Sequence, residues 1–165
     1  GYVIAKGDPF WTYSSGLAGI ICASAGNDLY HPIQAMIIAM IGVVVAYKLH
    51  YWVERKFKID DAVGAVAVHG YAGVVGLIIC GFVLWGYPSS GYDGLGYAAI
   101  NPVGMIIGAF IMFVVLGFIP GYVIAKILHA AGKLRIPREV ELAGLDYNIM
   151  EAASKDEKAV SSSSR

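Results

Sequence analysis

Long apolar runs separated by short polar connectors dominate the chain. Four runs are present, at about residues 10–26, 33–53, 62–87 and 102–130. The first is the shortest and the most polar, and the last has no acidic or basic side chain before Lys126. A helix needs about 20 apolar residues to cross a bilayer, whereas strands of a membrane barrel show weak alternation over about 10 residues. The pattern therefore predicts an all-α fold, a polytopic membrane helix bundle.

Charges in the connectors predict the orientation of this bundle. Basic residues occur at residues 54–61 and after residue 125, whereas the connectors 27–32 and 88–101 contain no Lys or Arg. Because connectors rich in Lys and Arg stay on the cytoplasmic side, we expect a multi-pass protein of the cell membrane with a cytoplasmic C-terminus. We divide the chain into a transmembrane region, residues 1–132, and a cytoplasmic tail, residues 133–165.

Composition narrows the functional classes. The 165 residues are 58% hydrophobic and 15% charged, which is too apolar for an ordinary soluble domain. Twelve acidic residues balance twelve basic ones, so no net charge favours a nucleic acid. Cys22 and Cys80 are too few and too far apart for a disulfide framework or a zinc site. Because the chain begins at Gly1 without a signal peptide, we expect it to be a piece of a longer polypeptide or an engineered fragment.

His69 is the outstanding candidate for function. It follows Asp61 by eight residues, a depth of roughly 12 Å along a helix, which places it near the middle of the bilayer. Ionisable residues at that depth are costly and commonly mark a pathway. A neutral imidazole offers one donor and one acceptor, which suits the passage of a small polar species. The alternative is a neutral histidine that hydrogen-bonds between helices for packing.

The other histidines leave a redox protein as a less favoured alternative. Histidine pairs can ligate haem, but His31, His50 and His129 lie at other predicted depths than His69. The sequence contains no Ser/His/Asp set, HExxH motif or pair of carboxylates within a run. We therefore expect neither an enzyme nor a cofactor or a metal.

Polar and small residues predict local features of the helices. Asp60 and Asp61 precede the third run and are expected to cap it, because carboxylates accept hydrogen bonds from exposed amides and favour the positive helix end. Pro120 lacks a backbone donor and predicts a kink. Small residues allow membrane helices to approach closely, and we expect tight packing at the glycines of the third and fourth runs: Gly64, Gly70, Gly73, Gly76, Gly81, Gly104, Gly108, Gly117 and Gly121.

Three segments resemble ammonium transporters of the Amt/Mep/Rh family. The run KIDDAVGAVAVHG, residues 58–70, is similar to the penultimate helix of that family. The stretch LAGI at residues 17–20, with Ala25-Gly26, resembles a helix two spans earlier, and RIPREVELAGLD at residues 135–146 resembles the family's cytoplasmic signature. The chain is similar to the last four spans of an eleven-helix ammonium-transporter fold.

This resemblance implies a homotrimer in which each subunit conducts ammonia through its own hydrophobic pore. In the family, ammonium is recruited outside, loses a proton and passes as ammonia along two stacked pore histidines. His69 matches the second of them, and Ala65, one turn earlier, would line the passage. Gly64 stands where many members have an aspartate, and Ala62 replaces a frequent proline.

The resemblance also implies a regulatory role for the tail. In the family, a P-II signal protein can plug the pore at the cytoplasmic face, where the tail packs. The matching residues here are Glu141, Leu142, Ala143, Gly144, Leu145 and Asp146. The function expected is transport of ammonium/ammonia across the lipid bilayer. The alternative is an ammonium sensor or receptor that relays binding through its C-terminal tail.

Overall fold

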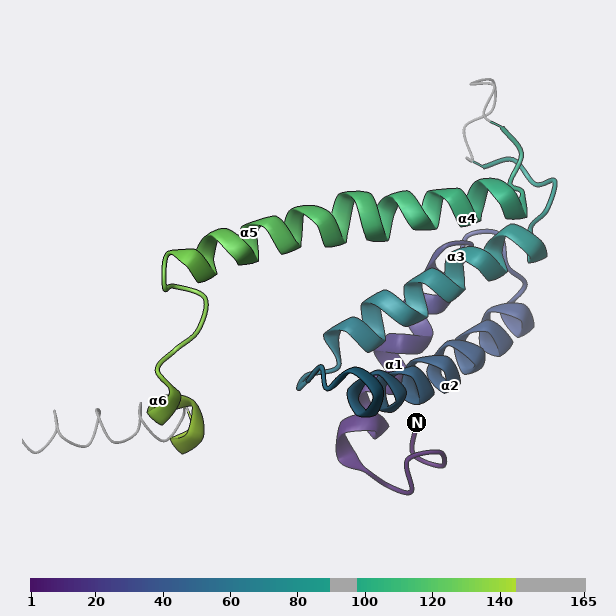
Figure 1. The fold of residues 1–165 in the computed structure, drawn as a ribbon. Coiled ribbons are helices and arrows are strands. Elements are labelled where there is room, and N and C mark those ends of the chain that lie inside the picture. The colour runs from purple at the N-terminus through teal and green to yellow at the C-terminus, as the bar shows by residue number, and fades with distance from the viewer. Residues whose placement is uncertain (90–97, 145–165) are drawn as a thin grey trace, which may run out of the picture. The chain divides into compact units, whose positions relative to one another are not determined.

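The computed structural model describes residues 1–89 and 98–144, which Figure 1 draws as a coloured ribbon. The chain divides into a first unit, Gly1–Phe118, and a second, Ile119–Arg165. The first unit contains the α-helices α1 (Pro9–Ser24), α2 (Pro32–Phe57), α3 (Ala72–Val83) and α4 (Pro102–Phe110) and the π-helices η1 (Val66–Tyr71) and η2 (Ile111–Phe118). The second contains α5 (Ile119–Ala130) and α6 (Arg138–Ala143). No strand occurs within the described ranges.

Three helices begin at a capping side chain followed by a proline. The Asp8 carboxylate accepts a hydrogen bond from the Trp11 amide at 2.9 Å, and the Asn101 side chain accepts one from the Gly104 amide at 2.7 Å. Proline is tolerated in the first turn because the amide it lacks would have no partner there. The three helix starts are therefore encoded locally, at Asp8-Pro9, His31-Pro32 and Asn101-Pro102.

Three helices in the described part of the chain are long and apolar enough to cross a membrane. They are Pro32–Phe57, with 26 residues, Val66–Val83, with 18, and Pro102–Ala130, with 29. α1 is a helix of 16 residues and falls short of that length. The prediction of a helical membrane bundle is confirmed, since the chain is a partial polytopic bundle of α- and π-helices.

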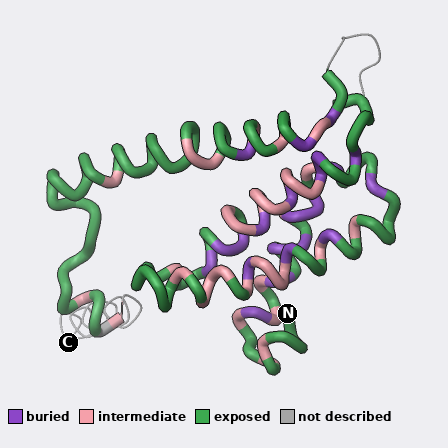
Figure 2. Tube along the Cα trace, turned by 45° about the vertical axis from the view of Figure 1, so that its right-hand side comes forward, coloured by how far each residue is buried: buried purple, intermediate pink, exposed green. Residues whose placement is uncertain are grey.

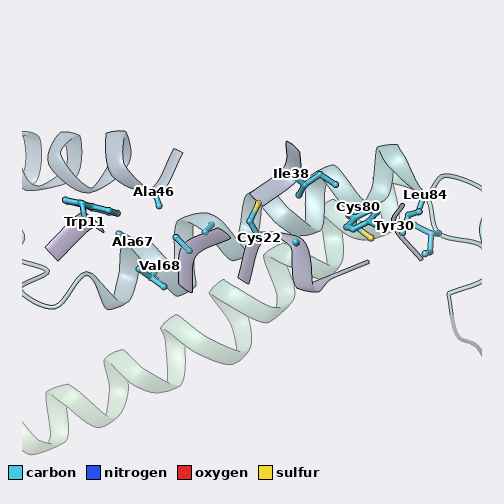
Figure 3. Packing of buried hydrophobic residues seen from close by; sticks show 13 residues of the cluster. Trp11, Cys22, Tyr30, Ile38, Ala46, Ala67, Val68, Cys80 and Leu84 are labelled. Atoms are coloured by element: carbon cyan, nitrogen blue, oxygen red, sulfur yellow. The ribbon is translucent and has the colours of Figure 1, made fainter. Parts of the chain in front are cut away.

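The core of the first unit lies where α1, α2 and the η1–α3 helix meet (Figure 2). Trp11, Cys22 and Cys80 are its largest fully buried side chains. In Figure 3 the core extends from Trp11 at one end, past Cys22, to Cys80 and Tyr30 at the other. Both cysteines are free thiols. Because most of the remaining buried side chains are small, the helix backbones approach closely.

Glycines of the third run lie at two close approaches, one to α1 and one to the start of α4. A Cβ atom on Gly76 would lie 2.2 Å from the Cys22 carbonyl oxygen, and one on Gly81 would lie 2.9 Å from the Pro102 Cα. The expected tight packing is confirmed at these two positions. In the fourth run, by contrast, a Cβ on Gly108 would meet no atom within 4 Å among the described residues.

The helix Pro102–Ala130 changes its hydrogen-bond register along its length. α4 is followed by η2, a π-helix, and Pro120 is the second residue of α5. π-helical turns pair residues five apart and are one of the known causes of helix bends. The kink expected at Pro120 stays a prediction, and the register change two residues before it was not expected from the sequence.

α5 in the second unit ends at Ala130, two residues before a glycine, and α6 follows it. Gly132 has a φ of +66°, and the Lys133 amide donates a hydrogen bond to the Leu128 carbonyl at 2.9 Å. This geometry ends a helix readily at glycine because the left-handed conformation strains residues with a Cβ. α6 begins after Pro137.

Candidate functional site

The candidate site is centred on His69, which lies on η1 and is exposed on the surface of the first unit. Ala65, four positions earlier, and Val66 are exposed as well, whereas Ala67 and Val68 are buried in the core. Among the described residues, none forms a hydrogen bond with the His69 side chain. One face of η1 therefore packs against α1 and α2, and the His69 imidazole lies on the exposed face.

The π-helical register of η1 was not predicted. It covers Val66–Tyr71, so His69 lies within it, and the helix continues as α3 from Ala72. π-helical turns are rare and occur frequently at functional sites. An apolar run shows which residues prefer the bilayer, but it carries no signal for whether each amide pairs four or five residues back.

Gly64 has a structural reason to be a glycine in this chain. Its φ is +65°, and a Cβ atom there would lie 2.7 Å from the Phe10 ring. A side chain would have to adopt the left-handed conformation and displace that ring. Gly64, which stands where many ammonium transporters have an aspartate, therefore lies in a tight turn just before the helix.

The carboxylate of Asp61 reaches across this turn to the start of the helix. It accepts hydrogen bonds from the Val66 amide at 3.2 Å and from the Ala67 amide at 2.9 Å. The Asp61 carbonyl also accepts one from the Gly64 amide at 2.8 Å. Both the charge and the lone pairs suit the exposed amides of a helix start. Asp60 is exposed, and its carboxylate accepts no hydrogen bond among the described residues.

His50 packs beside Asp61, an arrangement that the sequence did not reveal. Its Nδ1 lies 3.7 Å from Asp61 Oδ2, and the two side chains are only 10% and 15% exposed. The ring packs edge-to-face on Trp11 and Tyr51, with centroids 5.4 and 4.9 Å away. A possible signal was the short connector between the second and third runs, which keeps the end of one helix near the start of the next.

Side chains that commonly bind metal ions do not cluster in the described part of the chain. Within residues 1–89 and 98–144, no group of three or more His, Cys, Asp or Glu side chains could hold a metal ion. Cys80 donates a hydrogen bond to the Ala25 carbonyl at 3.4 Å. Next to it, burial raises the pKa of the Tyr30 phenol above its ordinary value.

The tail is described only as far as Gly144. Glu141 forms an ion pair with Arg135, and Leu142 is 76% exposed on α6. α6 ends at Ala143, and the Gly144 amide donates a hydrogen bond to the Val140 carbonyl at 3.1 Å. Leu145 and Asp146, the last two residues of the proposed regulatory segment, lie outside the described residues.

Comparison with known proteins gives consistent matches. Residues 4–155 match the model of the Ammonium Transporter Family. Ammonium transporter Amt1 of Methanocaldococcus jannaschii is 30% identical over 158 residues, which cover 96% of this chain and 39% of that protein. Amt2 of the same organism is 36% identical, with 87% of this chain and 33% of that protein covered. The ammonium transporter of Bacillus subtilis is 33% identical, with 82% and 34% covered.

The chain thus spans between a third and two-fifths of the length of these curated relatives. No solved structure matches it. The family match covers nearly the whole chain, from the packed helices through His69 to the described start of the tail. With its membrane-length helices, this multi-pass membrane chain belongs to the ammonium transporter family.

Proposed function

We propose that this chain forms part of an ammonium/ammonia transporter and that His69 and Ala65 line its hydrophobic passage. The observation that carries the proposal is the position of His69: an imidazole within a membrane-length apolar helix, in a chain that matches the ammonium transporter family. The relatives named as ammonium transporters support the choice of substrate.

The physical chemistry of the passage follows from the cost of charge in an apolar medium. A bare cation is expensive to transfer into hydrocarbon, and neutral ammonia is far less so. An apolar passage therefore excludes potassium and sodium and requires ammonium to leave a proton behind. A neutral imidazole can accept a hydrogen bond from ammonia, donate one to it or take up that proton.

The exposed face of η1 supports a passage that other helices complete. Ala65, Val66 and His69 lie on the surface of the first unit rather than in its core. We propose that further helices of the transporter cover this face and enclose His69. Because the chain resembles only the last four of eleven spans, we expect it not to enclose a pore alone. Liposomes bearing only these 165 residues should therefore show no ammonia uptake above that of empty liposomes. Conduction by these residues alone would contradict the proposal.

His69→Ala tests the role of the imidazole in the protein expressed from its complete gene. We expect lower ammonium flux or weaker discrimination against potassium, because the passage loses its donor and acceptor. His129→Ala is the matched control, since it removes an imidazole from α5, a different helix from the one that carries His69. Unchanged flux and selectivity in a folded His69→Ala protein would show that His69 serves only the packing of the helices. Ammonium binding without any flux in the wild-type protein would favour a receptor instead.

We further propose that the assembled protein is a homotrimer in the cell membrane with its C-terminus in the cytoplasm. The concentration of Lys and Arg in residues 54–61 and after residue 125 supports this orientation. The segment Glu141–Asp146 would then face the cytosol, where it could contact neighbouring subunits or a P-II signal protein. Crosslinking and protease accessibility in sealed vesicles would test the assembly and the orientation.

A further inference from the structure

Two buried polar atoms lie close together at one end of the core without a hydrogen-bond partner among the described residues. They are Trp11 Nε1 and His50 Nδ1. Buried nitrogen atoms in native structures nearly always have a partner, because an unpaired one is unfavourable. Asp61 Oδ2, at 3.7 Å, is the acceptor that His50 Nδ1 approaches. A shift of less than 1 Å would bring this pair within hydrogen-bond distance.

Asp61 connects His50 to the helix of the pore histidine. The same oxygen, Oδ2, accepts the hydrogen bond from the Ala67 amide, and Oδ1 accepts the one from Val66. Ala67 lies two residues before His69. The Asp61 carboxylate therefore contacts both His50, near the end of α2, and the first turn of the helix that carries His69.

The surroundings of His50 hold its ring in this position. Phe10 and Trp11 of α1 pack against it, with ring centroids 6.2 and 5.4 Å away. Tyr51 of α2 packs edge-to-face on it at 4.9 Å. A ring confined by aromatic side chains on several sides has little freedom to turn away from the carboxylate.

We propose that His50 is a positioning residue of the transporter, whose Nδ1 holds the Asp61 carboxylate against the first turn of the helix that carries His69. The inference rests on the proposed function for the part that concerns transport. Its structural part, the support of the Val66 and Ala67 amides through Asp61, does not depend on that function.

Two substitutions separate the donor from the shape of the ring. His50→Asn keeps an N–H donor near the position of Nδ1, whereas His50→Phe keeps an aromatic ring without a donor. Both are made in the protein expressed from its complete gene, and hydrogen exchange of the Val66 and Ala67 amides is measured at fixed pH. We expect His50→Phe to speed this exchange about tenfold, the scale of weakening one hydrogen bond to a charged group. His50→Asn should restore exchange to near the wild-type rate.

A double variant tests whether His50 acts through Asp61. Asp61→Ala removes the carboxylate and should itself speed exchange of the two amides. Adding His50→Phe to it should then change nothing further, because the shared partner is already absent. If His50→Phe is poorly folded, His50→Leu replaces it in the same comparison.

Transport completes the test and separates this inference from the proposed function. We expect ammonium flux to fall in His50→Phe and to recover in His50→Asn. The inference is overturned if the two variants are equally impaired, if His50→Phe matches the wild type in exchange, or if its effect persists unchanged beside Asp61→Ala. A wild-type protein without ammonium flux, but with the expected exchange pattern, would refute the proposed function and leave the His50–Asp61 contact standing.

Discussion

Replacing Gly64 by alanine tests how the helix of His69 begins. Gly64 lies in the turn before η1 with a φ of +65°, and its amide donates to the Asp61 carbonyl. Alanine would add a Cβ atom 2.7 Å from the Cζ atom of Phe10. The substitution therefore combines an unfavourable backbone conformation with a steric clash.

The two contributions can be estimated separately. The left-handed conformation costs a residue with a Cβ about 1–2 kcal/mol. Overpacking a filled site costs about 1–3 kcal/mol, and the Phe10 ring has little room to move because Trp11 and His50 pack against it. We expect Gly64→Ala to lower the apparent free energy of unfolding by about 2–5 kcal/mol.

Gly86→Ala is the matched control, because Gly86 has a φ of +89° and a Cβ there would meet no atom within 4 Å. It should cost about 1–2 kcal/mol, for the backbone alone. Denaturant unfolding of the purified protein in detergent measures both variants, and Gly64→Ala made together with Phe10→Ala should lose the clash. If Gly64→Ala is no more destabilising than Gly86→Ala, the steric part of this reasoning is refuted.

Two further predictions concern the core. Gly76→Ala should destabilise the protein by about 1–3 kcal/mol, because its Cβ would lie 2.2 Å from the Cys22 carbonyl oxygen; Gly108→Ala is the control for unfolding in detergent, and equal midpoints would contradict the prediction. Burial, with Cys80 nearby, raises the pKa of Tyr30, so the folded state keeps the phenol protonated to higher pH than the unfolded chain does. The stability this provides is present below about pH 10 and is lost as pH rises further. Tyr30→Phe should therefore lose less stability than the wild type between about pH 9 and pH 11, and equal losses in both proteins would count against a raised pKa.

The apolar runs alone were sufficient to predict the class of fold. A bilayer requires helices of a set length with their backbone groups paired internally, so the long run ending at Ala130 predicted a membrane helix without any knowledge of its neighbours. The helix starts were equally local, since Asn101-Pro102 combines a capping side chain with a residue suited to the first turn. His69 was also identifiable, because an ionisable residue within an apolar run is unusual wherever the run packs. Its expected depth of roughly 12 Å along the helix was wrong, because the helix begins at Val66 and His69 lies in its first turn.

The amino-acid sequence is enough to specify the helices, their apolar character and the histidine within one of them, because these depend on the solvent and on near neighbours in the chain. The packing of the helices sets three further features: a Cβ at Gly64 would meet Phe10, His50 lies beside Asp61, and His69 is exposed while Ala67 is buried. Each of these depends on where a different helix lies. Uniformly apolar helices can pack in many rotations and registers of similar hydrophobic energy, so the choice among them falls to close contacts and buried polar atoms, which arise only when the helices come together.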